Sequence, residues 1–197
     1  MRGKLILFFI FLGVALCEAR YFNTVVIDPG HGGRDAGAYW GGVKESTLNL
    51  IIAQKLAYEL KARGVKTVMT RRSDTTVSKA SRAAIANRYP NSIFVSIHFN
   101  AHTNTSIKGL ETFYLSSEGR KMAHEVQSRM ARGLKGRNRG IKNKGFYVLR
   151  ATNQPAILVE CGFISNSSER ARCATQWYKT TTARTIADGL MAYRKKR

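Results

Sequence analysis

The sequence has 197 residues, of which 44% are hydrophobic and 23% are charged, which is enough apolar material for one domain with a full core. This balance excludes an intrinsically disordered chain, in which hydrophobic residues are scarce. The 33 Lys and Arg residues outnumber the 12 Asp and Glu residues, and the formal net charge of +21 predicts an anionic partner.

The start of the chain resembles a secretory signal peptide. Arg2 and Lys4 form a basic beginning, and an almost unbroken apolar run follows over residues 5–16. The run is shorter than the roughly 20 apolar residues that cross a bilayer, so it favours export over a membrane anchor or a buried helix.

Cleavage is expected after Cys17 or Ala19, which makes residues 1–19 the signal peptide and residues 20–197 the mature domain. Lipidation of Cys17 is not expected, because the large Leu16 precedes it. We therefore expect an exported protein in the periplasm, in the cell wall or outside the cell, with no stable membrane span after cleavage. Export argues against nucleic acid as the anionic partner and favours cell-wall polymers.

Segments typical of strands and of helices alternate along the rest of the chain. In order, the sequence predicts a strand over residues 21–27, a helix over 46–63, a strand over 65–70, a helix over 78–87, strands over 93–97 and 110–115, a helix over 118–134, strands over 146–149 and 156–159, and a helix over 176–193. This alternation predicts an α/β fold: a single three-layer domain with an about six-stranded, mostly parallel sheet and helices on both faces.

Three polar motifs each follow a predicted strand. They are Asp28-Pro29-Gly30-His31-Gly32-Gly33, Ser96-Ile97-His98-Phe99-Asn100 and Glu160-Cys161-Gly162-Phe163. Ligands of open α/β sheets bind outside the carboxyl ends of the strands. We therefore expect His31, His98 and Glu160 to meet at one edge of the sheet.

Two histidines and a carboxylate are a common ligand set for catalytic zinc, which keeps one position open for water. Glu45, just before the predicted helix 46–63, is a plausible third ligand, and Glu160 would then act on the bound water. His102 and Glu111 are competing candidates that spacing alone does not exclude. Glu45 also suits a simpler role as a favourable charge near a helix N-terminus.

Other chemistries are less consistent with the sequence. Non-haem iron accepts the same ligand types, but those oxygenases usually have all-β barrels. The chain has neither a phosphate-binding loop with Lys and Ser/Thr nor a Gly-x-Ser-x-Gly motif, which argues against serine hydrolase chemistry. Cys161 and Cys173 form either a disulfide in an oxidising compartment or two buried thiols.

From about Val25 to Tyr193, the chain resembles the zinc-dependent N-acetylmuramoyl-L-alanine amidases of the amidase-3 type. The matching stretches, in order, are residues 26–33 with Asp35 and Gly37; Glu45 with Asn49-Leu50; Thr70-Arg71 with Asp74; Arg82 with Ala86-Asn87; residues 95–101; Arg139-Gly140; Val148-Leu149-Arg150; and residues 155–160 with Gly162-Phe163 and Ser165-Asn166.

This resemblance implies that His31, Glu45 and His98 bind one zinc ion and that Glu160 is catalytic. Two further residues, Arg82 and Asn100, match family positions near the site, where they bind substrate or support the loops. The implied substrate is peptidoglycan, cut at the amide between N-acetylmuramic acid and the L-alanine of the stem peptide. We expect a monomer that does not bind nucleic acid, and the resemblance leaves a protein activator open.

Departures from the family pattern carry expectations of their own. Phe99 stands where the family often has Ala, which narrows the cleft if the ring faces it. The short segment from Leu115 to Glu118 leaves no room for the inserted helix that covers the site in some members, so we expect an open site. Rival functions are a cationic wall-binding module without metal, a zinc peptidase that cuts within the stem, and a nucleic-acid binder.

Overall fold

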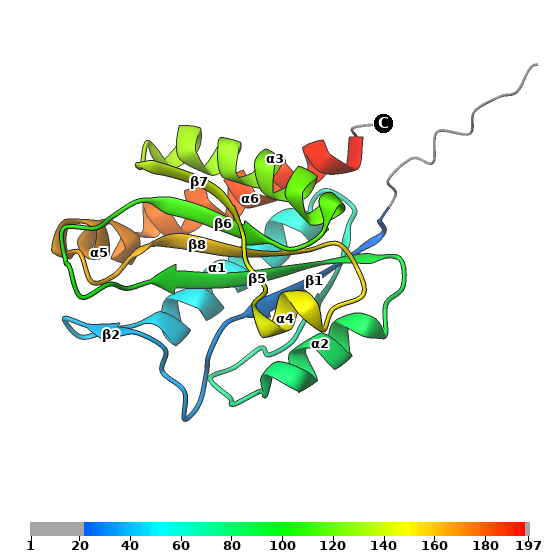
Figure 1. The fold of residues 1–197 in the computed structure, drawn as a ribbon, viewed down its shortest axis with the longest axis horizontal. Coiled ribbons are helices and arrows are strands. Elements are labelled where there is room, and N and C mark those ends of the chain that lie inside the picture. Colours follow the sequence, from blue (N-terminus) through cyan, green and yellow to red (C-terminus); the bar gives the residue numbers. More distant parts are fainter. Residues whose placement is uncertain (1–21, 196–197) are drawn as a thin grey trace, which may run out of the picture.

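The computed structural model describes residues 22–195, so the expected signal peptide lies outside the described residues. Its main sheet has six strands in the order β4-β1-β5-β8-β6-β7 (Figure 1). Within this six-stranded sheet, β6 pairs antiparallel with β8, and the other described pairings are parallel. The strands are β1 (Thr24–Pro29), β4 (Lys66–Met69), β5 (Ser92–Asn100), β6 (Leu110–Tyr114), β7 (Asn138–Asn143) and β8 (Ala156–Phe163). The predicted α/β class and the mostly parallel sheet are confirmed.

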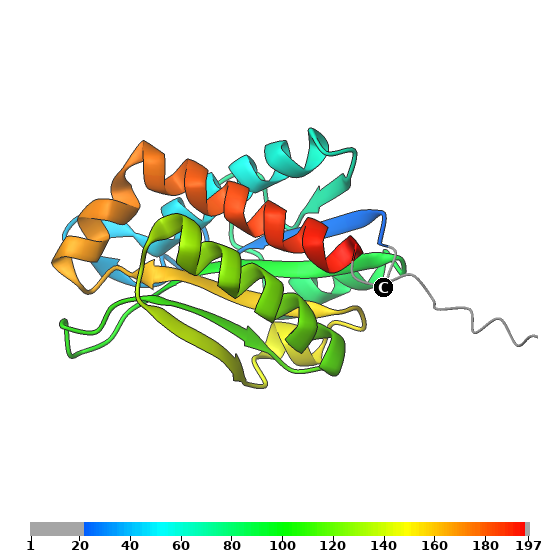
Figure 2. The same cartoon turned by 90° about the horizontal axis from the view of Figure 1, so that it is seen from above.

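Helices cover both faces of this sheet. Figure 2 shows α6 (Gln176–Lys195) lying between α1 (Glu45–Lys61) and α3 (Ser117–Leu134) over one face. Within residues 22–195, the helices on the opposite face are the shorter α2 (Lys79–Asn87) and α4 (Tyr147–Arg150), which pack on each other. One further helix, α5 (Ser167–Ala174), follows β8. The second face is therefore less covered, and it is the face on which the candidate site lies.

The pleat of the strands decides which side chains reach each face. In β5, Ile93, Val95 and Ile97 belong to the larger buried cluster with α1, α3 and α6, whereas Phe94 belongs to the smaller cluster with α2 and α4. Since successive side chains of a strand point to opposite faces, His98 lies on the same side as Phe94. On this face of β5, the buried Phe94 is therefore followed toward the end of the strand by His98, which belongs to the candidate site.

One predicted strand was wrong, and one strand was missed. Residues 146–149 are not a strand, because α4 occupies Tyr147–Arg150 and buries Val148 and Leu149 on one side. A short apolar run of this kind does not distinguish a strand from a helix. The sixth strand is instead β7, an edge strand whose only large apolar residue is Ile141.

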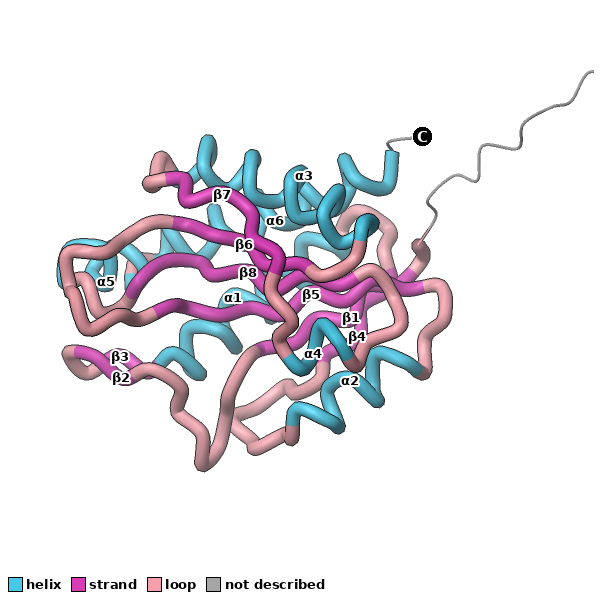
Figure 3. The backbone as a smooth tube through the Cα atoms, viewed as in Figure 1, coloured by secondary structure: helices cyan, strands magenta, loops and turns pink. Residues whose placement is uncertain are grey.

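The sequence also gave no indication of a small hairpin, which Figure 3 shows apart from the main sheet and directly before α1. It consists of β2 (Tyr39–Trp40) and β3 (Val43–Lys44), paired antiparallel. Gly41 and Gly42 both have positive φ, at 51° and 78°, as a tight two-residue hairpin turn requires. The hairpin delivers Glu45 at the first position of α1.

Cys161 and Cys173 are both free and buried, so of the two alternatives the structure has buried thiols. Burial raises the pKa of Cys173 to about 12 and raises that of Cys161 as well, which makes both thiols poor nucleophiles. Within residues 22–195, none of the helices combines the length and the apolar character that crossing a membrane requires.

Candidate metal centre

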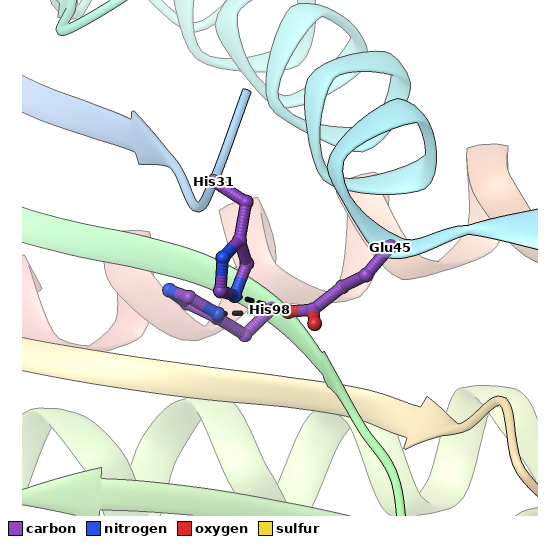
Figure 4. Close-up of side chains that lie close together, drawn as sticks. All are labelled: His31, Glu45 and His98. Atoms are coloured by element: carbon purple, nitrogen blue, oxygen red, sulfur yellow. Dashed lines mark hydrogen bonds and ion pairs between the residues drawn. The ribbon is translucent and has the colours of Figure 1, made fainter. Parts of the chain in front are cut away.

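His31, Glu45 and His98 come together from three elements at the carboxyl ends of β1 and β5. Figure 4 shows His31 on the loop after β1, Glu45 at the start of α1 and His98 on β5, with the three side chains pointing toward one another. One potential ligand atom from each residue lies within 4.8 Å of the other two. The structure thus brings together the residues that the sequence singled out as ligands.

Glu45 is the centre of this cluster. Its Oε1 lies 3.2 Å from Nε2 of His31 and 2.9 Å from Nδ1 of His98, and its Oε2 accepts a hydrogen bond of 2.9 Å from the backbone N–H of Ala38. Burial opposes ionisation of this carboxyl, but the hydrogen bonds and charges of the two histidines outweigh burial and hold its pKa well below the ordinary value. The carboxylate is therefore kept ionised, as a metal ligand must be.

His31 is held in an uncommon backbone conformation, with φ of 59°. Its Nδ1 donates to Oδ2 of Asp35 at 2.8 Å, which directs Nε2 toward Glu45. A carboxylate on the far nitrogen is the usual means of orienting a metal-binding histidine. The sequence reasoning gave Asp35 no role, although its place four residues after His31 in a glycine-rich turn was a usable signal.

Gly30 allows the histidines to approach each other. A Cβ atom at this position would lie 2.2 Å from Cε1 of His98, so any other residue would displace the ring. The ring centroids of His31 and His98 are 5.0 Å apart. Glycine at this point of the motif is therefore a packing requirement of the site.

Arg82 supports the loop that carries His31. Its guanidinium donates to Oδ1 of Asp28 at 2.6 Å, to the carbonyl of Pro29 at 2.6 Å and to the carbonyl of His31 at 2.7 Å. Arg71 adds hydrogen bonds to the carbonyls of Pro29 and Gly30 at 2.9 and 3.0 Å. Of the two roles expected for Arg82, these contacts support the one of holding the loop.

Glu160 lies beside the cluster on β8, where it is the register partner of His98. It is only 8% exposed, and its Oε2 has no hydrogen-bond partner among the described residues. Burial, and then the charges of Glu45 and Glu111, raise its pKa well above the ordinary value, while Lys144 opposes this rise. A buried carboxylate with a raised pKa and an unpartnered oxygen is a candidate proton carrier.

The cluster and Glu160 line one cavity of about 340 Å³. Its other walls come from the turn before α2, from α4 and from the end of β5, where Asn100 lies. Phe99 also lines it, but its ring belongs to the buried cluster under α1, α3 and α6. A substrate can thus reach Glu160 and the histidines from the same space.

The competing ligand candidates lie elsewhere. Glu111 accepts hydrogen bonds from Asn100 at 2.8 Å, from Arg139 at 3.0 Å and from Lys142 at 2.5 Å. His102 is exposed, and its Nδ1 accepts from the backbone N–H of Asn104 at 2.9 Å. Neither Glu111 nor His102 belongs to the group of potential ligands. Through its hydrogen bond to Glu111, Asn100 is linked to the charged network of Arg139 and Lys142.

The residues present fit a zinc ion. Two imidazoles and one carboxylate are a typical three-residue set for catalytic zinc, and the unpartnered oxygen of Glu160 lines the same cavity. Oxygen-rich ligand sets, which magnesium and calcium prefer, are not present in this cluster.

Comparison with protein families and known structures agrees with this chemistry. Residues 25–192 match the amidase-3 family, described as N-acetylmuramoyl-L-alanine amidase. The crystal structure of an N-acetylmuramoyl-L-alanine amidase from Clostridium difficile 630 is 40% identical, with a TM-score of 0.84, and the match covers 87% of this chain and 96% of that one.

Two further relatives differ in length and context. The N-acetylmuramoyl-L-alanine amidase LytC of Bacillus subtilis is 36% identical over 175 residues, which are 87% of this chain but only 35% of LytC. The CwlD amidase from Clostridioides difficile, solved in complex with the GerS lipoprotein, is 29% identical with a TM-score of 0.83, and the match covers 87% of this chain and 98% of that one.

Proposed function

Because the chain belongs to the N-acetylmuramoyl-L-alanine amidase family, we propose that it hydrolyses the amide between N-acetylmuramic acid and the first L-alanine of the peptidoglycan stem. The observation that supports this most directly is the cluster of His31, Glu45 and His98 beside the unpartnered carboxyl oxygen of Glu160. The family supports the substrate class, and the geometry supports these four residues as the ones that carry the reaction.

His31, Glu45 and His98 would hold the zinc ion. Bound zinc lowers the pKa of its water to about 7 and polarises the carbonyl under attack. Asp35 orients His31 through Nδ1, and Arg82 holds the loop after β1 through the carbonyl of His31. The protein therefore supplies a rigid ligand set whose third member, Glu45, stays ionised across the working pH range.

Glu160 is the proton carrier in this mechanism. Its carboxylate takes a proton from the attacking water, and the carboxyl then delivers that proton to the nitrogen of the departing L-alanine. Burial and then the charges of Glu45 and Glu111 raise the pKa of Glu160, so its carboxylate is a stronger base than an ordinary glutamate and accepts the proton that it later passes to the amine. Neighbouring Asn100, held by Glu111, lines the cavity at a position suited to contact with the substrate.

The sequence pattern of residues 1–19 supports export, and the high positive charge supports attraction to an anionic wall. β6 ends at Tyr114 and α3 begins at Ser117, so the segment between them is too short to hold an inserted helix. In this proposal, the site is therefore not covered by such a helix. In this proposal the protein acts as a monomer on peptidoglycan, and a protein activator stays open as an expectation. Activity of the purified chain alone tests this part.

The test is digestion of purified peptidoglycan by residues 20–197, with mass spectrometry of the products. The expected result is release of intact stem peptides that begin with L-alanine, stopped by a zinc chelator and restored by zinc. Cleavage within the stem would replace the amidase by a zinc peptidase. Binding without cleavage, with no zinc retained, would favour a wall-binding module.

A further inference from the structure

One wall of the cavity that holds the candidate metal centre is apolar and partly aromatic. It is formed by Phe146, Tyr147 and Val148, where α4 begins, and by Leu158 of β8, on which α4 packs. Leu158 stands two residues before Glu160, so both side chains lie on the same face of β8. The apolar wall therefore adjoins the carboxyl group that carries the proton.

Tyr147 is the aromatic residue of this wall whose ring the protein leaves unused. Phe146 packs edge-on against Phe113, with ring centroids 5.0 Å apart, and Nζ of Lys144 lies 4.9 Å from the centroid of Phe146. Tyr147 is 42% exposed, and among residues 22–195 its ring has no aromatic or cationic partner and its hydroxyl has no hydrogen bond. Of the exposed large hydrophobic side chains in this part of the chain, Tyr147 alone lines the cavity. Its ring is therefore available to a ligand.

The proposed substrate contains one rigid group that fits an exposed ring. On the acyl side of the scissile amide, a short lactyl link joins the carbonyl carbon to the pyranose ring of N-acetylmuramic acid. This link keeps the sugar close to the site whenever the carbonyl lies beside the metal ligands. On the amine side, the small methyl group of L-alanine comes first, and the stem continues as a flexible chain with charged groups. A pyranose has a flat face of C–H groups, which an aromatic ring covers without burying a polar group.

We propose that the ring of Tyr147 stacks on the pyranose of N-acetylmuramic acid and thereby selects amides that are attached to glycan. This inference rests on the proposed function and deepens it, because it assigns recognition of the sugar to one residue. A peptide amide without the sugar lacks this contact and is cleaved more slowly. Tyr147 makes the contact in the bound substrate as well as in the transition state, so its loss is expected mainly in KM.

The experiment compares two soluble substrates with the same stem, an N-acetylmuramoyl peptide and an (R)-lactoyl peptide, which lacks only the sugar ring. Residues 20–197 of wild type, Tyr147→Ala and Tyr147→Phe are assayed on both, with the released stem measured by liquid chromatography. Tyr147→Ala should lose about tenfold in kcat/KM on the muramoyl peptide and less than about twofold on the lactoyl peptide. Tyr147→Phe should keep wild-type activity on both, since it keeps the ring.

A second measurement does not depend on cleavage of the lactoyl peptide. Free N-acetylmuramic acid should inhibit cleavage of the muramoyl peptide, with an inhibition constant about tenfold weaker in Tyr147→Ala and unchanged in Tyr147→Phe. Tyr58→Ala is the matched control, because Tyr58 is a 75% exposed tyrosine of α1 that does not line the cavity. It should behave as wild type in every assay.

Wild-type activity of Tyr147→Ala on the muramoyl peptide, equal losses on both substrates or an unchanged inhibition constant would overturn the assignment of Tyr147 and leave the amidase function standing. A loss in Tyr147→Phe as large as that in Tyr147→Ala would also overturn it, because the ring remains. No cleavage of the muramoyl peptide by the wild type would instead refute the proposed function.

Discussion

Replacement of Arg82 by methionine tests how the loop of His31 is held in place. The Arg82 side chain is 6% exposed and its partner Asp28 is 1% exposed, so this ion pair is buried. Removal of one partner from a buried pair costs about 3–5 kcal/mol, because the other charge is left without compensation. Asp28 keeps hydrogen bonds from the hydroxyls of Thr70 at 2.6 Å and Ser96 at 2.7 Å, which places the expected loss near the lower end, at about 3 kcal/mol.

The assay is denaturant unfolding of metal-free residues 20–197, followed by a zinc titration of the folded protein. Arg63→Met is the control, because Arg63 forms ion pairs with Glu59 and Asp188 in which the side chains of Arg63 and Asp188 are 26% and 47% exposed. Pairs of this kind contribute about 1 kcal/mol or less. Arg82→Met should also weaken zinc binding, because the carbonyl of His31 loses its donor.

The double variant Asp28→Asn, Arg82→Met should recover part of the stability, since it removes the uncompensated charge as well. If Arg82→Met were as stable as Arg63→Met and bound zinc normally, the idea that Arg82 holds the His31 loop would be refuted.

Two further predictions concern the packing of the site and a buried carboxyl. Gly30→Ala should lower zinc affinity at least tenfold in a titration, because its Cβ would meet the His98 ring at 2.2 Å; normal affinity would show that the ring has room to move. Burial raises the pKa of Glu169 above its ordinary value of 4.5, against the opposing hydrogen bonds from two backbone N–H groups. The folded state therefore favours the protonated carboxyl, and the stability from this group is present below pH 4.5 and lost as the pH rises through the raised pKa. As the pH rises through this range, the wild type should lose stability relative to Glu169→Gln, which does not titrate at this position. Free energies of unfolding that keep a constant difference across this range would contradict the raised pKa of Glu169.

The sequence predicted which side chains come together, because a parallel sheet places the carboxyl ends of its strands at one edge. His31, His98 and Glu160 each come shortly after the end of a predicted strand. The topology of a parallel sheet alone is enough to expect these three side chains at one edge. Glu45 was harder to place, since its spacing equally suited a charge at a helix N-terminus. The family resemblance, rather than the spacing, distinguished it from Glu111.

The errors have physical causes. Residues 146–149 form an apolar run too short to show a helical period, and β7 is an exposed edge strand with almost no apolar alternation. The three groups by which Arg82 holds the His31 loop lie 51 to 54 positions away in the sequence, so no local pattern could reveal them. What sequence patterns capture is burial and period; they do not capture which distant carbonyl a buried guanidinium reaches.

The measurement that tests the account most directly is zinc content and stem release of residues 20–197, compared with those of Glu160→Gln and His98→Ala. We predict that wild type and Glu160→Gln each retain one zinc ion per chain, that only the wild type releases stem peptides, and that His98→Ala loses the metal. Loss of zinc from Glu160→Gln, or stem release by that variant, would contradict the division of the site into three ligands and one proton carrier.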